Sequence, residues 1–207
     1  MKTYNYSDLS SEKIGTLLKQ PKIDFTSIFQ TVQPIIDAVE KEGDEAVKRY
    51  TEKFDKVVLS SVSIDPQDLE VKIDESTKEA IDIAFQNIVE FHKAQQVADL
   101  EVETMPGVRC LKVTRPVERV GLYVPGGTAI LPSTAMMLSI PAMIAGCTTK
   151  VLATPPRKDG SVASEIIYIA QRAGVDKILL AGGAQAVAAM AIGTETVPKV
   201  DKIFRAG

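Results

Sequence analysis

The sequence is poor in the residues on which several kinds of site depend. Its 207 residues include one histidine, two cysteines and no tryptophan. A zinc site needs several convergent His, Cys, Asp or Glu side chains, so the single histidine, His92, offers no metal centre and is expected to lie on a helix surface. Two cysteines are too few for a disulfide scaffold and indicate a reducing compartment. We expect Cys110 and Cys147 to be small, buried apolar residues, because Cys147 follows a helix C-terminus, where the dipole disfavours a thiolate.

Basic charge and long apolar runs are also scarce. The net charge of −3 gives no basic footprint for nucleic acid. The longest apolar run, from Ala135 to Cys147, is broken by Ser139, Pro141 and Gly146 and is too short to span a membrane. The first residues lack the apolar core of a signal peptide. A hydrophobic content of 45% with 25% charged residues is ordinary for a soluble protein, so we expect a cytoplasmic protein that binds neither nucleic acid nor membrane.

The first 114 residues are predicted to be rich in helix. Ser10 is expected to cap a short helix that ends before Pro21. A second helical pattern runs from Phe25 to Val39 and contains Pro34, which is expected to kink the helix or mark a restart. Asp44 is expected to cap the next helix, and the clearest helical pattern covers 74–96. Strands are predicted over 57–64, 100–105 and 108–113.

From residue 115 onward, short apolar strands alternate with helical patterns. A parallel sheet with helices on both faces has this alternation, and ligands of such sheets bind at the carboxyl ends of the strands. We therefore predict an α/β fold in two regions: a helix-rich N-terminal region, 1–114, and an incomplete Rossmann-like sheet, 115–207. The predicted strands and helices are, in order, 117–124, 133–145, 150–154, 162–173, 177–180 and 184–192.

The first of these strands leads into a glycine turn. The strand 117–124 ends at Pro125-Gly126-Gly127, and a helical segment begins near Ser133. Glycines can take a positive φ and let a ligand approach the backbone, and a following helix N-terminus suits a phosphate. The spacing does not match the three-glycine dinucleotide fingerprint, so spacing alone favours a tight turn with no ligand.

Longer strings of residues identify a family. The string Arg115-Pro-Val-Glu-Arg-Val-Gly-Leu-Tyr-Val-Pro-Gly-Gly127 resembles histidinol dehydrogenases closely, and so does Leu131-Pro-Ser-Thr134. The same holds for Gly182-Gly-Ala-Gln-Ala186 and for the segment from Gly193 to Phe204. The resemblance extends from about Ile28 to Phe204. It implies an aldehyde-dehydrogenase-like architecture for the sheet region.

The resemblance also implies a function. Histidinol dehydrogenases oxidise L-histidinol to L-histidine through the aldehyde and reduce two NAD in sequence. They are homodimers that use zinc to orient the substrate and a glutamate–histidine pair to move protons. Tyr123 and Gln185 match positions that contact NAD in the family, although by position alone each is better interpreted as structural. Their loops, Pro125-Gly126-Gly127 and Gly182-Gly183, are the predicted phosphate-facing segments.

Other parts of the family pattern are missing. The third NAD residue of the family is an asparagine in a Gly-Pro-Gly-Asn string directly after the phenylalanine, whereas Phe204 is followed by Arg205-Ala206-Gly207. The zinc ligands, the acid–base pair and a substrate serine of the family all lie beyond this point. We therefore expect the chain to correspond to about the first half of the enzyme, to contain no catalytic or metal-binding residue, and to be inactive alone. A frameshift is one hypothesis for its last residues.

Two interpretations from different classes remain open. The chain is either part of an enzyme with a half-built NAD site, or a non-catalytic nucleotide-binding or interaction module. A cofactor domain of an aldehyde-dehydrogenase-like enzyme is a third interpretation, but no cysteine-centred catalytic string supports it. A reading frame that continues past codon 207 into histidine-rich motifs would favour the first.

The scarcity of ligands gives a prediction about metal. The purified chain is expected to hold no zinc with structural or catalytic affinity, because tetrahedral ligands are absent from its sequence. Elemental analysis after dialysis tests this. Stoichiometric zinc in a well-formed site within one chain would contradict it.

Overall fold

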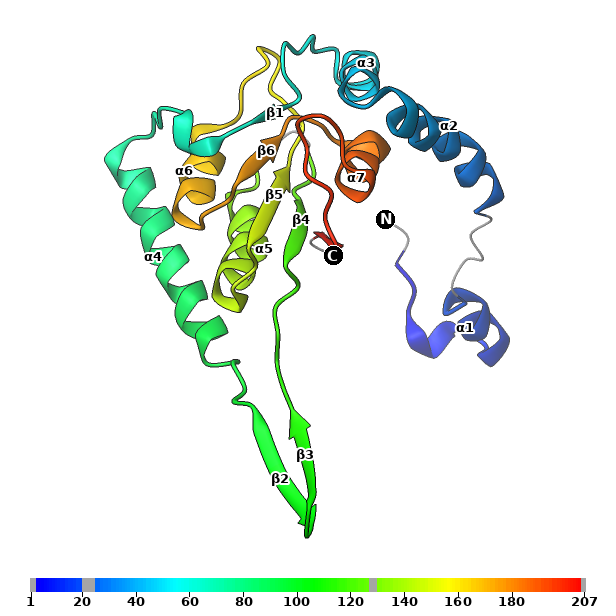
Figure 1. Cartoon of the computed structure of the whole chain (residues 1–207). Coiled ribbons are helices and arrows are strands. Elements are labelled where there is room, and N and C mark those ends of the chain that lie inside the picture. Colours follow the sequence, from blue (N-terminus) through cyan, green and yellow to red (C-terminus); the bar gives the residue numbers. More distant parts are fainter. Residues whose placement is uncertain (1–2, 20–24, 127–129, 206–207) are drawn as a thin grey trace. The chain divides into compact units, whose positions relative to one another are not determined.

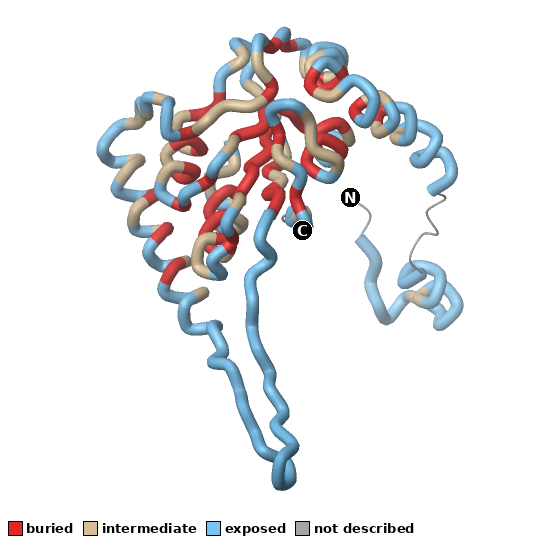
Figure 2. Tube along the Cα trace, in the orientation of Figure 1, coloured by how far each residue is buried: buried red, intermediate tan, exposed pale blue. Residues whose placement is uncertain are grey.

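The computed structural model describes residues 3–19, 25–126 and 130–205 (Figure 1). The chain forms two compact units, 1–32 and 33–207. The first unit contains the 3-10 turn η1 (Tyr6–Asp8), the helix α1 (Ser11–Leu17) and the start of α2 (Thr26–Glu42). The Ser10 side chain accepts a hydrogen bond from the Lys13 N–H, which confirms the predicted cap. None of the residues described in this unit is buried (Figure 2).

The second unit is built on a five-stranded sheet of order β1-β6-β5-β4-β7. The strands β4, β5, β6 and β7 are parallel, as predicted, and β1 is antiparallel to β6. Along the sheet, β4, β5 and β6 are neighbours in that order. The last strand, β7, pairs with the opposite side of β4. The strands are β1 (Ser63–Ile64), β4 (Arg119–Tyr123), β5 (Thr149–Ala153), β6 (Lys177–Leu179) and β7 (Lys202–Arg205).

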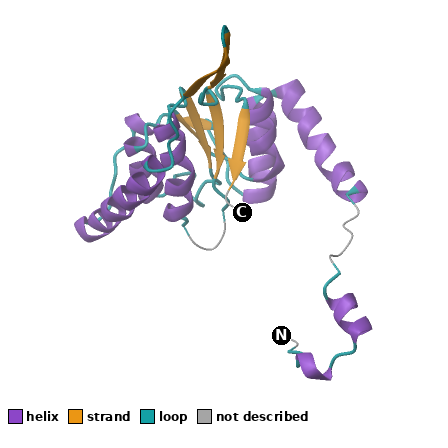
Figure 3. Cartoon of the chain, turned by 90° about the horizontal axis from the view of Figure 1, so that it is seen from below, coloured by secondary structure: helices purple, strands orange, loops and turns teal. Residues whose placement is uncertain are grey.

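Helices cover both faces of this sheet (Figure 3). The helices of one face, α4, α5 and α6, contribute to a single core with alternate strand residues such as Leu122 and Leu152. The other face carries α2, α3 and α7 over Val151 and Leu179. This alternation explains why the strands are apolar throughout, since both of their faces are buried. The helices are α3 (Asp44–Asp55), α4 (Glu75–Lys93), α5 (Pro132–Ala145), α6 (Ser164–Arg172) and α7 (Gly183–Ile192).

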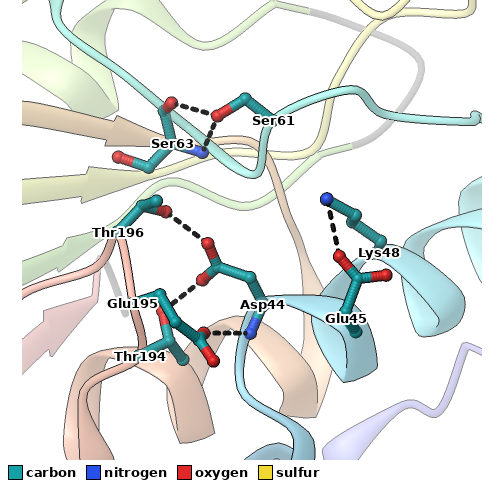
Figure 4. A network of polar contacts seen from close by, with 8 residues as sticks. All are labelled: Asp44, Glu45, Lys48, Ser61, Ser63, Thr194, Glu195 and Thr196. Carbon is teal, nitrogen blue, oxygen red and sulfur yellow. Dashed lines mark hydrogen bonds and ion pairs between the residues drawn. The ribbon is translucent and has the colours of Figure 1, made fainter.

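The start of α3 differs from the sequence prediction. Gly43 is the N-cap and Asp44 is the first helical residue, so Asp44 is not the cap. Its buried carboxylate instead accepts hydrogen bonds from the hydroxyls of Thr194 and Thr196, at 2.5 and 2.8 Å (Figure 4). The Glu195 carboxylate accepts from the Asp44 N–H at 2.7 Å and takes the place of a local cap. A distant loop therefore satisfies this helix end.

Two further predictions of local structure need correction. Only Ser63 and Ile64 of the predicted strand 57–64 pair with the sheet. The preceding residues Val57 and Leu59 are buried as connecting chain, the Val62 carbonyl accepts one hydrogen bond from the Leu180 N–H, and Ser61 bonds locally to Ser63. Pro34 does not restart the second helix, because α2 continues through it.

The remaining strands, β2 (Leu100–Met105) and β3 (Val108–Lys112), form a separate hairpin, as predicted. Cys110 lies on this hairpin and is exposed, so the prediction that it is buried is wrong, while Cys147 is buried as expected. Over the described ranges, the structure contains no helix that is both long and apolar enough to cross a membrane. The boundary expected near Thr114 stays a prediction.

The cap of α3 requires glycine at position 43. Its φ is +56°, and a Cβ there would lie 2.2 Å from Glu195 Oε2. Gly43→Ala is expected to destabilise the fold by about 3 kcal/mol, since it strains the backbone and displaces the capping carboxylate. Denaturant unfolding measures the effect.

Gly146→Ala is a control for a positive φ without a steric clash. Gly146 also has a positive φ, +83°, but a Cβ there would meet no atom within 4 Å. Its expected effect is the backbone strain alone, about 1–2 kcal/mol. Equal losses in the two variants would contradict the role given to Glu195.

Candidate functional site

Three loops meet at the carboxyl edge of the sheet, where β4, β5 and β6 end. They begin at Val124, Thr154 and Leu180. Ladder hydrogen bonds hold them together past the strand ends, from Val124 N–H to the Ala153 carbonyl and from Thr154 N–H to the Leu179 carbonyl. Since β7 returns on the other side of β4, the strand order reverses here. Ligands of open α/β sheets bind outside this edge, where the order reverses.

Pro155 separates two of these loops. A Cβ built on Gly126 would lie 2.6 Å from Pro155 Cγ, and a Cβ on Gly182 would also lie 2.6 Å from that atom. Both positions therefore need glycine for lack of space. Gly126 does not have a positive φ, so the expectation that it needs glycine's conformational freedom is wrong. Gly127 lies outside the described residues.

Tyr123 links the end of β4 to the start of α7. Its hydroxyl accepts a hydrogen bond of 2.9 Å from the N–H of Gly183, the first residue of α7. Gly183 has a φ of +60°, a left-handed conformation that favours glycine. The structure thus brings together Tyr123 and the second glycine loop, which lie 60 residues apart in the chain.

Gln185 lies in the first turn of α7 and is only 1% exposed. Its Oε1 atom is buried and has no hydrogen-bond partner among the described residues. A Cβ on Gly183 would lie 3.0 Å from this atom, so the amide is directed at the same glycine turn. Buried polar atoms nearly always have a partner, and each exception calls for a missing donor.

A cavity of about 360 Å³ opens between the loops after β4 and β5. Pro125 and Gly126 line it on one side, and Thr154, Pro155 and Arg157 line it on the other. The sequence predicts a loop over 155–161 at this edge, but it does not single out Pro155 or Arg157 as site residues. The Pro155-Pro156 pair directly after a buried strand was the available signal, because proline ends a strand and fixes the following loop.

Comparison with known proteins identifies the family. The family profile for histidinol dehydrogenase matches residues 18–207. The chain belongs to the histidinol dehydrogenase family. The chloroplastic histidinol dehydrogenase of Arabidopsis thaliana is 60% identical over 208 residues, which cover 100% of this chain and 45% of that protein. The histidinol dehydrogenase of Schizosaccharomyces pombe is 49% identical over 99% of this chain and 47% of its own length.

A solved structure agrees with the fold. The crystal structure of histidinol dehydrogenase from Elizabethkingia anophelis superposes with a TM-score of 0.85 at 36% identity, over 96% of this chain and 47% of that one. The chain therefore spans less than half the length of these relatives. A histidine biosynthesis trifunctional protein of Saccharomyces cerevisiae also matches, at 51% identity over 26% of its length.

The described part of the chain offers no cluster of metal ligands. No three His, Cys, Asp or Glu side chains gather there in a way that could hold a metal ion. The His92 ring on α4 is partly buried, with Nδ1 2.8 Å from Gln95 Oε1 and Nε2 buried without a hydrogen-bond partner among the described residues. Burial raises the pKa of the Cys147 thiol, which makes this cysteine a poor nucleophile.

The contact with Pro155 gives a prediction about the edge itself. Gly182→Ala is expected to destabilise the fold by about 1–3 kcal/mol, because its new methyl group overlaps Pro155 Cγ. In a Pro155→Ala background Cγ is absent. The nearest atom of residue 155 to the new methyl group is then Cβ, at 3.5 Å. The same substitution is then expected to cost at least about 1 kcal/mol less. A double-mutant cycle by denaturant unfolding measures this coupling, and additive effects would contradict the steric explanation.

Proposed function

We propose that this chain forms the NAD-binding part of a histidinol dehydrogenase, which oxidises L-histidinol to L-histidine through the aldehyde. The observation that carries the proposal is the unpartnered Gln185 Oε1 beside the Tyr123–Gly183 hydrogen bond, at the edge where the strand order reverses. Both side chains match family positions that contact NAD. When bound, NAD supplies the hydride acceptor for the oxidation.

The Tyr123 hydroxyl is suited to hold a polar group of the cofactor. It accepts one hydrogen bond from Gly183 N–H, so its own proton is left to donate. The N–H that it accepts from stands at the positive end of the α7 dipole, and this polarises the hydroxyl as a donor. A ligand oxygen placed at this edge is therefore met by an oriented donor.

Gln185 supplies the complementary group. Its carbonyl oxygen is an acceptor without a donor, held in a helix that the core fixes in place. A hydroxyl or amide N–H of the cofactor would satisfy it and remove the penalty of a buried, unpaired oxygen. A donor and an acceptor that both lie next to Gly183 are the pair that a ribose or carboxamide group needs.

The glycines keep this edge open to a ligand. Gly126 and Gly182 bring their backbones against Pro155, and Gly183 turns the chain directly into α7. Side chains at these positions would fill the space in front of the α7 N-terminus. This supports the two glycine loops, Pro125-Gly126 and Gly182-Gly183, as the segments that face the cofactor's phosphates.

Zinc and the proton-transfer groups belong to the part of the relatives' length that this chain does not span. The described residues do not fit zinc, since they contain no group of three suitable ligands. L-Histidinol is accordingly proposed as the substrate of a longer polypeptide or assembly, with a homodimer as its form. The free thiols of Cys110 and Cys147 support a reducing compartment, for which we propose the cytoplasm.

Calorimetric titration of NAD into the purified chain tests the site. Tyr123→Phe and Gln185→Ala are each expected to weaken binding by about 0.5–1.5 kcal/mol, which is a roughly 2- to 12-fold rise in Kd, because each removes one hydrogen bond to the ligand. Melting curves recorded on the same samples report any loss of folding.

Two matched variants control for the loss of a buried polar group elsewhere. Tyr168 donates to Asp82, and Gln171 donates to the carbonyls of Pro66 and Leu69, both away from the carboxyl edge. Tyr168→Phe and Gln171→Ala are expected to lower Tm and leave the NAD affinity unchanged. Wild-type affinity in both Tyr123→Phe and Gln185→Ala, or no binding by the unaltered chain, would overturn the proposal and favour a non-catalytic module.

A further inference from the structure

Four buried side-chain atoms of the described residues have no hydrogen-bond partner, and three of them belong to the helices α3 and α7. They are Thr51 Oγ1, Asp55 Oδ2 and Gln185 Oε1. Thr51 and Gln185 are 0% and 1% exposed, and Asp55 is partly exposed. All three atoms are acceptors, and a buried polar atom nearly always has a partner. Three such atoms on one pair of helices indicate that a donor group belongs beside them.

The two helices run antiparallel, which brings these atoms to the same end. Asp44, the first residue of α3, bonds Thr194 and Thr196, which follow α7 directly (Figure 4). Thr51 and Gln185 each lie about 10 Å along their helices from these bonded ends, at a rise of about 1.5 Å per residue. The last turn of α3 is therefore level with the first turn of α7.

The end of α3 also lies at the carboxyl edge of the sheet. Asp55 is the last residue of α3, and the chain continues from it to Val57 and Leu59. A Cβ built on Gly160, in the loop after β5, would lie 3.8 and 3.9 Å from the side chains of these two residues. Asp55 thus ends its helix at the edge where α7 begins.

The Asp55 carboxylate is in an unfavourable position. It lies at the C-terminus of α3, where the helix dipole is negative, and burial raises its pKa. The next residue, Lys56, does not neutralise it, because its Nζ donates to the Lys53 carbonyl at 2.7 Å. A carboxylate in this position gains most from a ligand that brings hydroxyl donors.

The two halves of NAD would lie on opposite sides of the α7 N-terminus. The diphosphate separates the nicotinamide from the adenosine, so phosphates at the glycine loops place one half on each side. The cavity between the loops after β4 and β5 lies on the α6 side, since Ala163 and Ile166 line it. It offers the room that a substrate needs beside the nicotinamide. The adenosine half is therefore left to the side of α3.

We propose that Asp55 binds the ribose hydroxyls of the adenosine half of NAD and selects NAD against NADP. The inference rests on the proposed function, which places NAD at this edge. The ribose diol supplies the two adjacent donors that the acceptors of α3 and α7 lack. Rossmann-like folds use an acidic residue on the 2′-hydroxyl in this way, and here the acid comes from α3. The 2′-phosphate of NADP would instead bring negative charge against the carboxylate.

Calorimetric titration of NAD and of NADP into the same samples tests the assignment. The unaltered chain is expected to bind NAD at least about 30-fold more tightly than NADP. Asp55→Asn and Asp55→Ser are each expected to reduce this ratio at least about tenfold, because they remove the charge that repels the 2′-phosphate. Asp55→Glu keeps the charge and is expected to keep the preference for NAD.

Glu52→Gln is the matched control, since it removes an exposed carboxylate from the same helix. It is expected to leave the ratio within about threefold. Melting curves of Asp55→Asn are expected to show no loss of Tm, because the variant removes an unpaired charge from the negative end of α3. A purely structural role for Asp55 predicts the reverse: a lower Tm and an unchanged ratio.

The outcomes separate this inference from the proposed function. Equal affinity of the unaltered chain for NAD and NADP, or an unchanged ratio in the Asp55 variants that remove the charge, overturns the role of Asp55 and leaves NAD binding in place. No binding of NAD by the unaltered chain overturns both.

Discussion

The reversal of strand order after β6 determines how the sheet face that carries α2, α3 and α7 is built. To reach the far side of β4, the chain must cross through α7 and a return loop and then enter β7. Three contacts hold this return: Val200 N–H bonds the Met190 carbonyl, Asp201 bonds Arg119, and Glu195 caps α3. Arg119 holds the pKa of Asp201 below its usual range, so this carboxyl stays ionised where ordinary ones begin to protonate.

The same return loop explains how the helices of that face are placed. Two contacts that are usually made within one segment are here made between α3 and the return loop. Glu195 of the loop caps α3, and Asp44, the first residue of α3, anchors the loop through Thr194 and Thr196. The positive end of the α3 dipole stabilises the negative charge of Glu195, and the hydrogen bond from the Asp44 N–H lowers the pKa of the Glu195 carboxyl. The string from Gly193 to Val197, which identifies the family, therefore has a structural use in this chain that is separate from cofactor binding.

Much of the sheet region was predictable from sequence, since buried parallel strands are apolar on both faces and helices between them have a different period. The start of β1 was not, because Val57 and Leu59 are buried without pairing, and burial alone gives the same pattern as a strand. The role of Asp44 was also out of reach, because its partners lie about 150 residues away. Gln185 was found only through its resemblance to a family position, and the unpartnered oxygen that gives it a physical role appears only in three dimensions.

Glycine was the residue most easily misread. Gly126 and Gly182 are required by the bulk of Pro155, whereas Gly43 and Gly183 are required by their backbone angles. The amino-acid sequence alone does not distinguish a glycine required by lack of space from one required by its backbone angles.

The strand β7 has a consequence for the behaviour of the chain in solution. Among the described strands it pairs with β4 alone, so its outer row of backbone groups is open. Such an edge is a template for non-native association with other chains. Lys202 and Arg205 bracket the half-exposed Phe204 there, and the Lys202 Nζ lies 5.3 Å from the centre of its ring. Charges that flank an apolar residue on an edge strand disfavour such association, because an approaching strand must first strip water from them.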